Sequence, residues 1–199
     1  TIPNSGLMAR PLDLFDTAIP QIWHLTDELG GCRRHLIGLF NWAEETTQTL
    51  GIEDDDPCVG FDFWTNEFIT PFSGHLSLEL PPGSCRVISY VKQQDFPQLV
   101  STSRHVTQGA VDIVSLQWDA KNGILRGKSK IVGSDPYELR VVAGSPDSRW
   151  KAKAVCISAA DKRAKVTASV KQTGLNVRAK IRSSKTREVA WQIAFEKKN

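Results

Sequence analysis

The sequence lacks the features that mark membrane proteins and metalloproteins. It has no uninterrupted run of about 18 apolar residues, the length that a membrane-spanning helix needs. Its four cysteines are widely spaced and form no C-x-x-C pair of the kind that holds zinc. The sequence therefore predicts no membrane segment, no metal site and no other cofactor.

The cysteines also bear on the cellular compartment. Cys85 and Cys156 fall within strand-like runs, where a free thiol packs as a small apolar side chain. We therefore expect buried free thiols, a pattern that favours a reducing compartment such as the cytoplasm. The opening residues lack the basic start and apolar core of a signal peptide. The chain starts at Thr1 and its single methionine is Met8, so we expect it to be part of a longer protein.

Helical periodicity is almost absent, and only residues 7–18 have a pattern that fits a short helix. Runs rich in β-branched and aromatic residues recur instead, bounded by Pro, Gly, Asn and Asp, at a spacing typical of β-sandwiches. We predict strands at 21–26, 33–42, 58–64, 75–80, 84–91, 110–119, 124–132, 137–142, 149–157, 165–171, 175–182 and 189–195. Between the sixth and seventh of these, Asn122-Gly123 predicts a two-residue hairpin turn.

The last three runs alternate apolar and polar residues with period two, as half-buried antiparallel strands do. One face of the final run, for example, carries Trp191 and excludes Gln192. The predicted fold class is all-β: an antiparallel β-sandwich, with two consecutive sandwiches and a short irregular or helical N-terminal lead. Residues 1–95 would form the first sandwich with its lead, and residues 96–199 the second.

Charge is unevenly distributed along the chain. Residues 1–57 hold 3 basic and 10 acidic residues, whereas residues 150–199 hold 13 basic and 3 acidic residues. A basic end can bind nucleic acid. The basic residues here alternate with apolar ones and lack interleaved aromatic residues, which is typical of the solvated face of a sheet. We therefore expect no nucleic-acid partner.

The polar segment Ser101–Gly109, STSRHVTQG, is the one place that invites a catalytic reading. Ser103 or Ser101 would be the nucleophile and His105 the base. Side chains two apart on a strand are about 6.6 Å apart, too far for a hydrogen bond, and no G-x-S-x-G motif surrounds either serine. The segment is better interpreted as a polar joint between the two halves. We expect Arg104 to be at least half buried there, bonded to residues 1–95.

Two further features suggest binding sites. Six tryptophans occur, and an exposed one can stack on a sugar ring; Trp150 is the one expected to be exposed. The candidate binding residues are Trp150 and, from the polar segment 101–109, Arg104 and His105. The acidic run EDDDP at 53–57 lacks the glycine and closing glutamate of a calcium loop, so we predict a solvated turn.

The order of several motifs resembles a known family. They are ARPLDLFD, QIWHL, LIGLFNW, FDFWTNEF, LPPGSCRVIS, PQLVSTSRHVTQG, DPYEL and VAWQIAF, and together they span nearly the whole chain. Their succession resembles the C-terminal region of α-galactosidase-like glycoside hydrolases of families 27 and 36, the melibiase group. The resemblance implies a preceding (β/α)₈ barrel that carries two catalytic aspartates and performs retaining hydrolysis. Those catalytic motifs have no match here, so no catalytic residue carries over.

The resulting hypothesis is a non-catalytic β-sandwich region that supports the catalytic barrel or mediates oligomer contact. The alternatives are a carbohydrate-binding module and a stand-alone interaction domain with a basic face. An exposed, coplanar tryptophan patch would favour the first alternative, and a continuous basic surface the second. An apolar patch near residues 1–20 would favour barrel docking.

Overall fold

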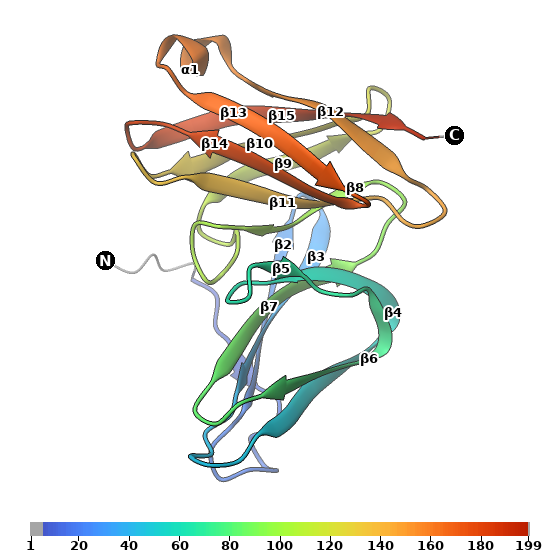
Figure 1. Ribbon diagram of the computed structural model, residues 1–199, viewed down its shortest axis with the longest axis vertical. Coiled ribbons are helices and arrows are strands. Elements are labelled where there is room, and N and C mark those ends of the chain that lie inside the picture. The colour runs from blue at the N-terminus through green and yellow to red at the C-terminus, as the bar shows by residue number, and fades with distance from the viewer. Residues whose placement is uncertain (1–5, 199) are drawn as a thin grey trace. The chain divides into compact units, whose positions relative to one another are not determined.

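The computed structural model describes residues 6–198 and is almost entirely β-structure (Figure 1). The predicted all-β fold, with antiparallel sheets packed as in a sandwich, is confirmed. The chain divides into two compact units. The first comprises the residues up to Glu28 together with Arg33–Gln93, and the second comprises Leu29–Cys32 together with the chain from Gln94 onward.

The first unit is one seven-stranded antiparallel sheet. Its strands are β1 (Arg10–Pro11), β2 (Ile22–Leu29), β3 (Cys32–Phe40), β4 (Gln48–Asp62), β5 (Glu67–Phe68), β6 (Phe72–Leu80) and β7 (Cys85–Lys92). They are ordered β1-β2-β3-β7-β4-β5, and β6 pairs with β4 beside this path.

A single sheet can form a sandwich here because β4 changes partner along its length. Its first part pairs with β6 and its last part with β7, and the register shifts between Asp54 and Cys58. The core of the unit includes Leu39 of β3, Ile52 of β4 and Leu80 of β6, so it receives side chains both from the β6 part of the sheet and from the β3–β7 part. The predicted turn at 53–57 is wrong. This run is an exposed irregularity inside β4, because a bulge carries the strand from one partner to the next.

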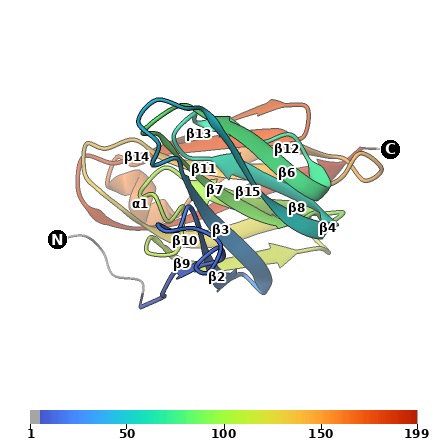
Figure 2. The same cartoon turned by 90° about the horizontal axis from the view of Figure 1, so that it is seen from below.

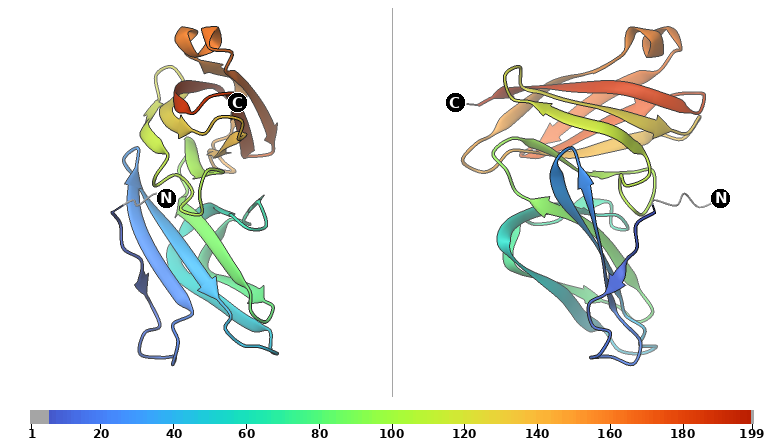
Figure 3. Two further views of the ribbon diagram at one scale, coloured as in Figure 1. Left: turned by 90° about the vertical axis from the view of Figure 1, so that its left-hand side faces the viewer. Right: turned by 180° about the vertical axis from the view of Figure 1, so that it is seen from behind.

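The N-terminal lead is irregular, and its described part, residues 6–21, contains no helix. It runs along the edge of β2, where Arg10 lies opposite His24 and Pro11 opposite Trp23 (dark blue in Figure 3). The helical alternative for residues 7–18 is therefore wrong for the described part. The segment pairs briefly with a strand and then turns.

The second unit is a sandwich of two four-stranded antiparallel sheets. Its strands are β8 (Pro97–Thr102), β9 (Ile113–Asp119), β10 (Ile124–Ile131), β11 (Tyr137–Ala143), β12 (Trp150–Ile157), β13 (Thr167–Thr173), β14 (Asn176–Arg182) and β15 (Arg187–Lys197). One sheet has the order β12-β15-β10-β9 and the other β13-β14-β11-β8. Helix α1 (Ala159–Arg163) links β12 in one sheet to β13 in the other (Figure 2). The segment that we interpreted as a joint thus begins in β8, inside this unit.

The core of the second unit contains the alternating residues of its strands. Trp191 of β15 is 1% exposed, as its period-two pattern predicts, whereas Gln192 is exposed. The indole of Trp191 donates to Ser129 Oγ at 2.8 Å, and the Tyr137 hydroxyl donates to Asp112 Oδ2 at 2.6 Å. These bonds satisfy polar atoms that would be costly to bury unpaired.

Two local predictions need correction. The turn between β9 and β10 spans four residues, 120–123, and only Gly123 has positive φ. Asp119 makes this possible, because its carboxylate accepts from the Asn122 backbone and side chain at 3.2 and 2.9 Å. The four cysteines are free as expected, but Cys156 is exposed on the outer face of β12, and only Cys58 is fully buried. No helix among the described residues is long and apolar enough to cross a membrane.

Candidate functional site

The serine and histidine of the polar segment 101–109 have separate partners. The Ser103 hydroxyl accepts from the Glu138 amide at 2.8 Å and donates to the Pro136 carbonyl at 3.5 Å. His105 Nδ1 lies 3.0 Å from Thr107 Oγ1. These contacts hold the loop against β11 and its neighbouring turn, and neither joins the hydroxyl to the imidazole as a nucleophile and its base require.

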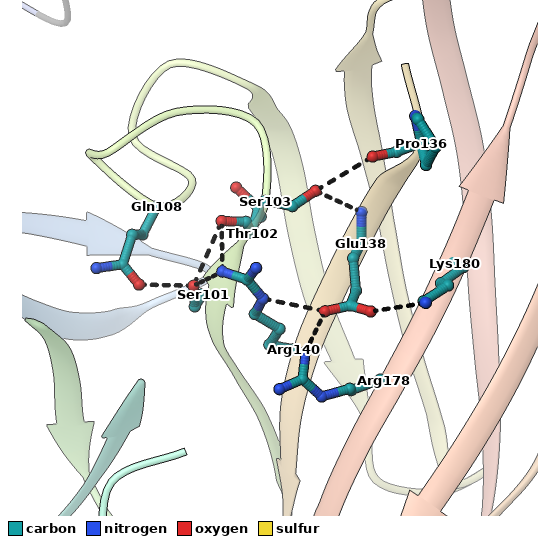
Figure 4. A network of polar contacts seen from close by, with 9 residues as sticks. All are labelled: Ser101, Thr102, Ser103, Gln108, Pro136, Glu138, Arg140, Arg178 and Lys180. Atoms are coloured by element: carbon teal, nitrogen blue, oxygen red, sulfur yellow. Dashed lines mark hydrogen bonds and ion pairs between the residues drawn. The ribbon is translucent and has the colours of Figure 1, made fainter. Parts of the chain in front are cut away.

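A network of charged and polar side chains connects β8, β11 and β14 (Figure 4). At its centre Glu138 Oε1 accepts from Arg140 Nε at 3.2 Å and from Arg178 at 2.6 Å, and Lys180 lies 3.7 Å from Oε2. Arg140 also donates to Ser101 Oγ at 3.1 Å. Burial lowers the pKa of Arg140, and Glu138 opposes that shift. The Glu138 carboxylate thus contacts three cations, and these contacts tie β11 to β14.

The most deeply buried cation of this region is Arg140, which is 5% exposed. The side chain of Arg104 retains 34% exposure, so the expectation that it is at least half buried is confirmed. The ion pair of Arg104 is a 3.9 Å contact with Asp135 of the same unit, and the expected partner in residues 1–95 was the wrong choice. The reason is register: Arg140 lies opposite Ser101 in the ladder, whereas Arg104 follows the end of β8.

Trp150 is not the exposed tryptophan that we predicted. It is half-buried at the end of the second unit, where its indole donates to the Asp95 carbonyl at 2.8 Å. Trp118 packs edge-on against it with ring centroids 5.2 Å apart, and the Lys197 ammonium lies 5.9 Å from its ring centre. These contacts leave the ring poorly placed to stack on a sugar. The exposed tryptophans are Trp42 and Trp64.

The most unusual surface of the chain lies in the N-terminal lead. Six large apolar side chains within thirteen residues are exposed, among them Phe15 at 98% and Met8 at 82%. We call this group the lead surface; it consists of Leu7, Met8, Leu12, Leu14, Phe15 and Ile19. Single exposed apolar residues are ordinary, but a cluster of them marks an interaction site.

Hydrogen bonds to buried groups hold the lead surface in place. Asp13 is 8% exposed, and its carboxylate accepts from the amides of Gln21 at 2.8 Å and Ile22 at 3.2 Å. Asp13 is thus buried, whereas its neighbours Leu12 and Leu14 are exposed.

The far end of the lead is fixed as well. The Pro20 carbonyl accepts from the indoles of Trp42 at 2.9 Å and Trp23 at 3.3 Å. Trp42 in turn stacks on Phe40 with centroids 5.1 Å apart, and half of its surface is exposed beside the lead. An apolar patch near residues 1–20 was the feature expected to favour barrel docking. The sequence pattern does not show that Asp13 is buried while the apolar residues around it are exposed.

Comparisons with known proteins do not assign the chain to a family. No protein family and no curated protein sequence matches the chain. Among solved structures, the chain is similar to isomalto-dextranase from Arthrobacter globiformis T6, complexed with panose, at 14% identity and a TM-score of 0.35. The match covers 96% of this chain and 40% of that one. The chain therefore spans less than half the length of that structure. No group of three or more His, Cys, Asp or Glu side chains among residues 6–198 is placed to bind a metal.

Proposed function

We propose that the chain is a non-catalytic β-sandwich region of an α-galactosidase-like glycoside hydrolase, and that it docks on the catalytic (β/α)₈ barrel through the lead surface. The observation that carries this proposal is the exposure of Leu7, Met8, Leu12, Leu14, Phe15 and Ile19 on a segment whose backbone is held in place. Covering such side chains with another apolar surface is favourable, at about 25 cal/mol per Å² removed from water.

The order in the lead supports docking over an incidental patch. A segment that is already fixed loses less conformational entropy on binding than a disordered one. Asp13 fixes one part of the lead and Pro20 the other, so Leu14, Phe15 and Ile19, which lie between them, are presented without a separate folding step. The polar network around Glu138 supports the non-catalytic role, because its charged side chains form ion pairs with one another.

The proposal is tested by hydrogen–deuterium exchange on the chain alone and mixed with a separately produced barrel of a melibiase-group α-galactosidase. We expect the barrel to slow amide exchange in residues 6–20 and around Trp42. Slower exchange elsewhere only, or no change with barrel in excess, contradicts docking through the lead surface.

A further inference from the structure

The outer face of the sheet β12-β15-β10-β9 is hollowed, and the hollow has a volume of about 890 Å³. Small-ligand sites usually measure roughly 300–1,000 Å³. The hollow lies within the second unit, and all four strands contribute to it. Its outward side chains include Ser115, Gln117, Arg126, Lys128, Cys156 and Gln192.

A row of hydrogen-bonding side chains crosses the floor of the hollow. Gln117 of β9 lies opposite Arg126 of β10, which lies opposite Gln192 of β15. Neighbouring strands are about 4.8 Å apart, so these three side chains stand side by side across the sheet. Each glutamine amide offers two donors and an acceptor, and the guanidinium offers donors only. A hydroxyl group both donates and accepts hydrogen bonds. The row therefore suits a ligand that carries several hydroxyl groups.

The side chains beside the row are short, so the space above the floor of the hollow stays open. In the ladder Lys128 lies between Ser115 of β9 and Ala190 of β15, and Cys156 of β12 lies opposite Gln192. None of these three neighbours is long enough to fill the space above the floor.

The charges of the hollow are already balanced by protein carboxylates. Arg126 forms an ion pair with Asp119, and Lys128 Nζ lies 3.0 Å from Glu188 Oε2. Hydrogen bonds from Asn122 lower the pKa of Asp119, so this carboxylate is ionised at neutral pH. An anionic ligand would compete with Asp119 and Glu188 for the two cations. A neutral ligand would not.

The geometry points to a binding site for a neutral oligosaccharide, lying across the strands and held by hydrogen bonds to Gln117, Arg126 and Gln192. The described lining contains no aromatic ring exposed for stacking, so affinity comes from the polar row and the shape of the hollow. The choice of a sugar as the ligand rests on the proposed function. The hollow and its polar row do not depend on it.

Titration calorimetry tests the site with raffinose, maltotriose and cellotriose as separate probes. We expect at least one probe to bind with a Kd of about 1 mM or tighter, and the double variant Gln117→Ala/Gln192→Ala to weaken it at least tenfold. Asn176→Ala is the matched control, because Asn176 is an exposed amide on the other sheet. It should leave the Kd unchanged. Binding that the double variant leaves unaffected, or no binding by any probe, overturns the proposal.

Cys156 supplies a second readout inside the hollow. It is the exposed cysteine, so its alkylation can be followed by mass mapping with and without the bound sugar. Slower alkylation of Cys156 alone supports the site. Protection that depends on protein concentration and not on sugar identifies a second copy of the chain as the occupant and contradicts the proposal. Neither result alters exchange in residues 6–20, so the two proposals fail independently.

Discussion

His24 Nε2 and His35 Nδ1 lie 2.9 Å apart on neighbouring strands of the first unit, with their rings nearly parallel. His35 also stacks on Tyr90, with centroids 4.8 Å apart. One imidazole of such a pair donates and the other accepts, so the bond requires that at least one ring is neutral. Burial lowers the pKa of both histidines. The positive charge of Arg33 adds to this effect, and for His35 Asp54 and Asp27 oppose it.

The histidine pair makes stability fall in acid. A histidine with a lowered folded-state pKa binds fewer protons when folded than when unfolded, so its stabilising contribution is present above the unfolded value near 6.5 and is lost as the pH falls toward the folded value. We expect the free energy of unfolding to decrease from pH 7 to pH 5. His35→Gln should reduce that decrease, as measured by urea titration at each pH. The exposed His75→Gln is the control, and an equal effect from it would contradict the assignment.

The network around Glu138 predicts a contrast between two arginines. Arg140→Ala should cost about 3–5 kcal/mol, because it removes one partner of a buried ion pair. Arg104→Ala should cost less than about 0.5 kcal/mol, since its ion pair is long and partly exposed. Denaturant titrations of both variants check this. Similar losses from the two substitutions would mean that Arg104, as we first expected, is the important cation.

The final strand predicts a second contrast. Trp191→Ala should lower the free energy of unfolding by about 3–5 kcal/mol, because it leaves a cavity in the core and removes the hydrogen bond to Ser129. Gln192→Ala should cost less than about 0.5 kcal/mol, since its side chain faces outward. Thermal and urea unfolding of the two variants give the comparison. Equal losses of stability in the two variants would mean that the register assigned to β15 is wrong.

Thiol reactivity should follow burial. Desolvation raises the pKa of Cys58 to about 12, and the nearby Asp54 and Asp56 add to the shift. The thiolate is the reactive form, so Cys58 should resist alkylation until the protein unfolds, whereas exposed Cys156 should react first. Timed alkylation followed by peptide mass mapping measures the order. Early modification of Cys58 in the native protein would show that the core of the first unit is accessible to the reagent, and would contradict the prediction.

The strands could be predicted from the sequence, but not their partners. Period-two alternation fixed the faces of β13, β14 and β15, because one side of each strand is buried. The change of partner along β4 was missed, since a bulge leaves no periodic signal. Strand β8 was interpreted as part of a polar joint because of its hydroxyl residues, Ser101 and Thr102. Both are buried, and the Ser101 hydroxyl bonds to Gln108 and Arg140, partners that no local pattern shows.

Site residues were harder to predict for the same reason. Trp150 and Arg104 stood out in the sequence by residue type, but their contacts come from Asp95 and Asp135, which no local pattern connects to them. The row formed by Gln117, Arg126 and Gln192 exists only once three strands are in register. The apolar residues of the lead could be identified in the sequence, whereas their exposure, beside a buried Asp13, is known only from the structure.

The central claim is that the lead surface docks on a catalytic barrel, and a binding titration of variants tests it most directly. The chain is titrated against the barrel of a melibiase-group α-galactosidase, and the Kd is compared with that of the variant Met8→Ser/Phe15→Ser. Trp64→Ser is the control, because Trp64 is exposed but lies outside the lead. Our account predicts binding that the double variant weakens at least tenfold and Trp64→Ser leaves unchanged. No binding, or equal loss in both variants, would contradict it.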